Sequence, residues 1–120
     1  MRAAVVGLAT LTFGVSVAAS HAAGRMTPAE IQSTFFTAQV FTAATPSNVK
    51  FKMTFSPDGK VTREPVGTAG AKGQGTWKLS KEGFCTKWQG GQSNCFAVLP
   101  SGANKWSILK GTAVVAIWTK

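Results

Sequence analysis

Two cysteines flank a pair of glycines within the stretch GQGTWKLSKEGFCTKWQGGQSNCF, residues 73–96. Glycine adopts positive φ without a Cβ clash, so Gly90-Gly91 predicts a tight turn between two antiparallel strands. A turn centred on Gly90 places Cys85 directly opposite Cys95, and opposed strand residues can lie close enough for a disulfide. A shift of one residue would send the two side chains to opposite faces. The disulfide would therefore also fix the register of the hairpin.

Two other roles for the cysteines fit the spacing less well. Redox-active dithiols usually form C-x-x-C, whereas nine residues separate Cys85 from Cys95. A zinc site would need two further ligands beside the two thiolates. We therefore predict a structural disulfide, no metal site and no cofactor, in a protein of an oxidising compartment.

The N-terminus has the features of a secretory signal peptide. Arg2 supplies a positive start, Ala3–Ala19 is apolar and uncharged, and Ser20 and Ala22 place small residues at positions −3 and −1 of a cleavage site. A membrane helix would need about 20 apolar residues, and this run is shorter. We expect cleavage after Ala22 and a periplasmic or secreted protein.

Cleavage would leave one small β-rich domain at residues 23–120 after a signal peptide at residues 1–22, and it would change the available chemistry. His21 is the only histidine of the chain and would be lost with the signal peptide. The remaining domain would lack the commonest general base, and serine–histidine or cysteine–histidine catalysis would be excluded. The formal net charge of +9 would fall to +8, because Arg2 is removed too.

The acidic residues give little support to an enzyme. Glu30 is explained as part of a helix cap and Asp58 as a turn residue. Glu64 and Glu82 could serve as a glycosidase-like acid and base, but their spacing does not require it. The chain has no glycine–lysine motif for phosphate binding. We predict a protein that is not an enzyme, with no catalytic residues.

The rest of the chain predicts a mainly β fold. A helix should begin at Thr27-Pro28-Ala29-Glu30 and end near Phe36. Val49–Phe55 alternates apolar and polar residues without a break, and Ser56-Pro57-Asp58-Gly59 predicts a turn into a return strand at Lys60–Glu64. The other predicted strands are Thr37–Ala43, Thr76–Leu79, Phe84–Trp88, Asn94–Leu99, Lys105–Leu109 and Thr112–Thr119, with a flexible connection or a frayed strand start at Gly67–Gly75 and a turn at Pro100–Asn104. A short N-terminal helix followed by an antiparallel meander favours a small barrel or a strongly curved sheet.

One spaced pattern of glycine, tryptophan and cysteine resembles a known family. The pattern G-x-W … G-x-C-x-x-W … C-F occurs here at Gly75, Trp77, Gly83, Cys85, Trp88, Cys95 and Phe96. With the helix and the first hairpin, it is similar to a family of small exported β-rich proteins of alphaproteobacteria, a domain of unknown function. The resemblance covers most of residues 23–120 and implies a secreted or periplasmic β-rich domain, with no catalytic residues to carry over. The G-x-W element is also similar to the motif of lipocalin-type barrels, although theirs lies in the first strand and this one lies mid-chain.

The four tryptophans leave two interpretations open. Trp77, Trp88, Trp106 and Trp118 all fall on predicted strands. They could pack the core of a small barrel. They could instead face a ligand such as a sugar or a lipid, because barrels of this size are either filled by side chains or hold one small molecule.

The positive charge also has two interpretations. Lys50 and Lys52 share the outward face of one predicted strand, and we expect Lys60 and Arg63 beside them on the next strand. Such a surface could simply keep the domain soluble. It could instead attract an anionic envelope component, or an envelope or secreted protein. Nucleic acid would suit the charge, but export disfavours it as a natural partner, and the sequence does not indicate an oligomeric state.

Taken together, these patterns predict a non-catalytic periplasmic or secreted binding or interaction module. The alternatives are a hydrolase inhibitor that presents a loop near the disulfide, a structural envelope-associated protein, and a barrel that binds a small ligand. A tryptophan-lined cavity open to solvent would favour the small ligand, whereas a filled core would favour recognition at the surface.

Overall fold

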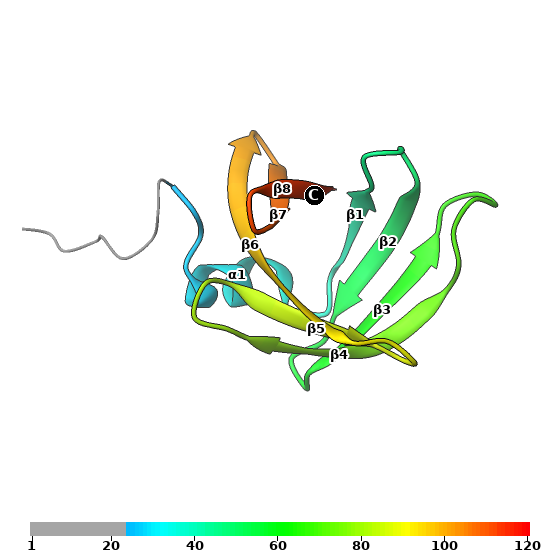
Figure 1. The fold of residues 1–120 in the computed structure, drawn as a ribbon, viewed down its shortest axis with the longest axis horizontal. Helices are drawn as coiled ribbons and strands as arrows, with labels where there is room; N and C mark the ends of the chain where they lie inside the picture. The colour runs from blue at the N-terminus through cyan, green and yellow to red at the C-terminus, as the bar shows by residue number, and fades with distance from the viewer. Residues whose placement is uncertain (1–23) are drawn as a thin grey trace, which may run out of the picture.

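One short helix precedes eight antiparallel strands that close into a barrel, because β1 pairs with β8 (Figure 1). The structure is a computed structural model that describes residues 24–120, so the predicted signal peptide lies outside the described residues. The elements are α1 (Pro28–Phe35), β1 (Val40–Ala44), β2 (Lys50–Phe55), β3 (Lys60–Pro65), β4 (Gly73–Leu79), β5 (Phe84–Trp88), β6 (Ser93–Gly102), β7 (Lys105–Lys110) and β8 (Ala113–Thr119). The predicted mainly β fold with one short helix and an antiparallel meander is confirmed, and of its two forms the chain adopts the barrel.

The predicted capping box fixes the start of α1. The Glu30 backbone N–H donates to Thr27 Oγ1 at 3.1 Å, and the Thr27 backbone N–H donates to Glu30 Oε1 at 2.9 Å. Pro28 occupies the first turn, where its missing N–H costs nothing. Ile31 and Phe35, one turn apart, are the buried residues of the helix. They form one apolar face that packs onto the barrel. Within the described part of the chain, no helix has the length and apolar character to cross a membrane.

Aromatic side chains fix α1 across one end of the barrel. Phe36, at the C-cap of the helix, stacks on Phe55 with ring centroids 4.5 Å apart and lies 4.2 Å from the ring of Trp77. Phe35 makes edge-on contacts with three further rings, those of Phe41, Trp106 and Trp118. Burial of such rings contributes the largest share of stability in a small domain. We call this end, closed by α1, the plugged end.

The alternating direction of the strands sorts the connections between two ends. The β2–β3, β4–β5 and β6–β7 connections lie at the plugged end with α1. The β1–β2, β3–β4, β5–β6 and β7–β8 connections lie at the opposite end, which we call the mouth. Figure 1 shows the β1–β2, β3–β4 and β5–β6 connections extending away from the side that holds the helix.

The predicted hairpin register is confirmed in β5 and β6. Cys85 pairs with Cys95 and Thr86 with Asn94, and the two sulfurs form a disulfide. Phe84 and Thr86, on either side of Cys85, line the barrel interior. Because strand side chains alternate between faces, the disulfide lies on the outer face of the barrel. It holds β5 and β6 together without occupying the interior.

Three predicted boundaries are wrong for identifiable reasons. The strand predicted from Thr76 begins at Gly73, so the end of Gly67–Gly75 is a strand start and only its first part is a connection. A Cβ at Gly75 would lie 2.2 Å from the backbone oxygen of Lys87, so glycine here reflects close strand approach. The predicted turn at Pro100–Asn104 is mostly strand, since β6 runs to Gly102 with a bulge after Pro100, a position that tolerates proline. The first strand begins at Val40 instead of Thr37.

Candidate functional site: a cavity at the mouth of the barrel

The barrel interior is filled near α1 and hollow toward the mouth. A cavity of about 250 Å³ is lined by residues of seven strands and by Thr45 in the β1–β2 connection. Its deep end is formed by Phe55, Phe84 and Trp118, which are at most 3% exposed. Toward the mouth the lining includes Phe51, with Thr45 at the rim. The cavity therefore runs from an apolar floor against the plugged end to an opening among the loops.

Arg63 is the one charged residue among those that line this cavity. Its Cζ atom lies 4.4 Å from the ring centroid of Trp88 and 5.3 Å from that of Phe51. Its Nε atom is buried and has no hydrogen-bond partner. Among residues 24–120, the guanidinium makes no hydrogen bond and no ion pair. A cation with free donors therefore lies beside the apolar chamber.

Side chains alternate between the two faces of β3, and this alternation directs Arg63 inward. Val61, two residues earlier, is fully buried, and Arg63 pairs across β2 with the buried Met53. Gly73 lies opposite Arg63 on β4, where an added Cβ would be 2.8 Å from Arg63 Nε and 3.3 Å from Trp88 Cε3. The absence of a side chain at Gly73 thus provides the space in which the guanidinium meets Trp88.

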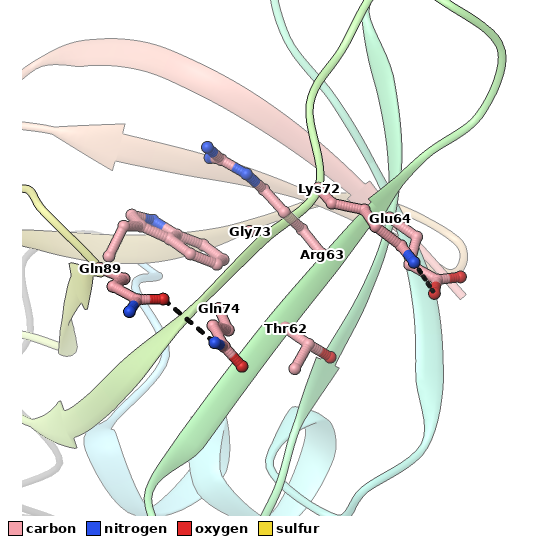
Figure 2. A pocket seen from close by; sticks show the side chains of 8 residues that line it. Thr62, Arg63, Glu64, Lys72, Gly73, Gln74 and Gln89 are labelled. Carbon is pink, nitrogen blue, oxygen red and sulfur yellow. Dashed lines mark hydrogen bonds and ion pairs between the residues drawn. The ribbon is translucent and has the colours of Figure 1, made fainter.

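A second hollow of about 610 Å³ lies over β3, β4 and the start of the β5–β6 connection, and Arg63 and Trp88 line both this hollow and the cavity. Four of its polar side chains form two pairs. Lys72 Nζ lies 3.9 Å from Glu64 Oε1, and Gln74 Nε2 donates to Gln89 Oε1 at 3.1 Å. Figure 2 shows the two pairs apart from each other, with the Arg63 guanidinium extending away from the Glu64–Lys72 pair. Exposed pairs of this kind contribute little energy.

The four tryptophans divide between two environments. Trp77 and Trp106 pack on Phe36 and Phe35 of the α1 region, and Trp77 Nε1 donates to the Ser56 carbonyl at 2.8 Å. Trp118 also packs on Phe35 but presents part of its ring to the cavity, and Trp88 lines the cavity beside Arg63. The four tryptophans therefore do not share one environment.

The predicted basic surface is wrong in its composition. Lys50, Lys52 and Lys60 are exposed, but Arg63 points into the barrel instead of joining them. Lys52 pairs across the strands with Glu64, and Lys60 lies at the plugged-end terminus of β3, away from Lys50. The outer face carries dispersed lysines and one opposed acid, not four clustered cations. The reason is the alternation of side chains along β3: Arg63 lies two residues after the buried Val61 and therefore shares its inward face.

The acidic residues are separated by the fold. Glu30 caps α1, and Asp58 Oδ1 accepts a hydrogen bond from the Lys60 backbone N–H in the β2–β3 turn. Glu64 lies on β3 near the mouth, whereas Glu82 lies in the β4–β5 turn at the plugged end. The topology does not bring Glu64 and Glu82 together as an acid–base pair.

Comparison of the chain with models of protein families, with curated proteins and with solved structures finds no match in any of the three. The functional interpretation therefore depends on the geometry of the barrel and its cavity.

Proposed function

We propose that this protein is a non-catalytic periplasmic or secreted binding module that holds one small, largely apolar molecule inside its barrel. The observation that carries the proposal is the cavity between the aromatic floor and the mouth. Eight-stranded barrels are just wide enough either to be filled by side chains or to hold one small ligand. This barrel does both: side chains fill the plugged end, and the mouth end is hollow.

The lining supports an apolar ligand. Apart from Arg63, Thr45 and Thr86, the residues around the cavity are apolar or aromatic. Ligand sites typically combine a mostly apolar wall with a small number of polar groups that fix orientation. At about 30 Å³ for each water-sized group, 250 Å³ holds roughly eight non-hydrogen atoms. The expected ligand is thus smaller than a typical lipid, or inserts only one end of a longer chain.

The disulfide supports an exported location. Cys85 and Cys95 are paired on the outer face of the barrel, and the described part of the chain has no free cysteine. Structural disulfides persist in secreted and periplasmic proteins and are rare in reducing compartments. A binding module in such a compartment would meet small molecules directly from outside the cell or from the envelope.

The proposal is tested by filling the cavity. Ala116 lines the cavity, whereas Ala113 on the same strand is exposed. We expect 1-octanol to bind the purified protein with one-to-one stoichiometry in titration calorimetry. Ala116→Leu should weaken this binding at least tenfold because its added carbons occupy the chamber, while Ala113→Leu should leave it unchanged. Equal binding by both variants, or none by the wild type, would refute a ligand inside the barrel.

A further inference from the structure

The Arg63 guanidinium lies over two aromatic rings, and within residues 24–120 it makes no hydrogen bond or ion pair. Its Cζ atom lies 4.4 Å from the Trp88 centroid and 5.3 Å from the Phe51 centroid. Cation–π contacts engage the flat faces of a guanidinium, whereas its N–H groups point outward in its plane. These contacts hold the group in place, and its terminal nitrogens are the part left to meet an anion.

The Nε atom of Arg63 is enclosed beside Gly73. It has no hydrogen-bond partner in the part of the chain that the structure describes. Buried donors in folded proteins are almost always paired, because an unpaired one loses its hydration without compensation. The terminal Nη atoms are not buried in this way, so an acceptor that entered the cavity would pair with them and gain a charge-assisted hydrogen bond.

We infer that the ligand is a monocarboxylate whose head group pairs with Arg63 and whose apolar chain lies against Phe84 and Trp118; this inference rests on the proposed function. A carboxylate matches the fork of a guanidinium with two parallel hydrogen bonds. Among residues 24–120, Arg63 is the only cation that lines the cavity, so a single negative charge is neutralised there. A phosphate dianion would keep uncompensated charge beside apolar walls, which is costly. The nearby Lys72 lies by Glu64 on the outer face.

The direction of the ligand follows from the two ends of the cavity. The floor residues Phe55, Phe84 and Trp118 offer no charged group, so the apolar chain should lie deep. Arg63 pairs with Gly73 at the start of β4, close to the mouth, so the carboxylate should lie near solvent. The room for roughly eight non-hydrogen atoms matches the eight carbons of octanoate, whose two carboxylate oxygens would lie beside Arg63 toward the mouth.

The experiment compares octanoate with 1-octanol, its uncharged counterpart of equal length, by titration calorimetry at low salt. The wild type should bind octanoate roughly 10- to 100-fold more tightly, the gain typical of a hydrogen bond to a charged group. Arg63→Gln should remove this preference and leave the affinity for 1-octanol within about threefold. Arg63→Lys, which keeps the charge but not the fork, should restore only part of the preference.

Lys60→Gln is the matched control, because Lys60 lies on the same strand with its side chain exposed. It removes the same charge and should leave both affinities unchanged. A preference that falls equally in Lys60→Gln and Arg63→Gln would show general charge attraction and overturn the inference. Tighter binding of octyl phosphate than of octanoate would overturn the choice of a monocarboxylate.

If Arg63→Gln does not fold, NMR spectra of the wild-type protein provide the test. The Nε–H resonance of Arg63 should shift in NMR spectra on addition of octanoate and stay nearly fixed with 1-octanol. Equal binding of octanoate and 1-octanol by the wild type would refute the role of Arg63 and leave the proposed function standing. Binding of neither probe would refute the proposed function itself.

Discussion

Truncation of one phenylalanine at each end of the barrel should have unequal costs. Phe36 belongs to the plugged end, is 2% exposed, and contacts the rings of Phe55, Trp77 and Phe84 at centroid distances of 4.5, 4.2 and 5.6 Å. Phe51 belongs to the mouth and is only partly buried. The same chemical change, Phe→Ala, therefore compares a packed end with an open one.

The expected magnitudes follow from these surroundings. Phe36→Ala should lower the free energy of unfolding by about 3–5 kcal/mol, the usual range for a fully buried phenylalanine. Phe51→Ala should cost about 1.5–3 kcal/mol, because a partly exposed ring loses less transfer energy than a fully buried one and the contact with Arg63 adds about 0.5–1 kcal/mol. The total free energy of unfolding of a small domain is about 5–15 kcal/mol. Phe36→Ala should therefore be marginally stable, whereas Phe51→Ala should remain well folded.

Urea denaturation followed by far-UV circular dichroism measures both values. Val40→Ala is the control, since Val40 is 58% exposed and its truncation should change the free energy of unfolding by less than about 0.5 kcal/mol. Equal losses for Phe36→Ala and Phe51→Ala would mean that the mouth is packed as tightly as the plugged end. The interpretation of the mouth as a binding chamber would then fail.

Two further predictions concern the outer face. Cys85→Ser should lower the free energy of unfolding by roughly 2–5 kcal/mol in urea denaturation under oxidising conditions, and a loss below about 1 kcal/mol would show that the disulfide contributes little beyond the pairing of β5 and β6. Co-sedimentation with anionic vesicles should decline as the salt concentration rises. The double variant Lys50→Gln/Lys52→Gln should reduce it no more than Lys→Gln changes at the exposed Lys105 and Lys110, because the lysines are dispersed over the surface. A selectively larger effect at Lys50 and Lys52 would reinstate a specific basic surface.

Local patterns predicted most of this fold because they report local physics. The alternation in Val49–Phe55, the turn at Ser56–Gly59 and the capping residues of α1 each fixed one element within a residue or two. The paired cysteines fixed the register of β5 and β6. Closure of the barrel through β1 and β8 could not be fixed in this way, because it depends on strand tilt and stagger accumulated over the whole sheet.

The candidate site was only partly visible in the sequence. Trp88 and Trp118 were identified as candidates, but nothing local separates them from Trp77 and Trp106, whose burial depends on where α1 docks. Arg63 was assigned to the wrong face because arginine is expected outside. Its position two residues after Val61 was the signal that could have placed it inside.

A crystal structure of the protein grown with 8-bromooctanoate tests the central claim most directly, because bromine is located independently by its anomalous scattering. We predict a bromine peak at the floor of the barrel, between Phe84 and Trp118, and a carboxylate within hydrogen-bond distance of Arg63. A bromine peak confined to the second hollow beside Glu64 and Lys72, or no peak in the barrel at saturating concentration, would contradict the claim.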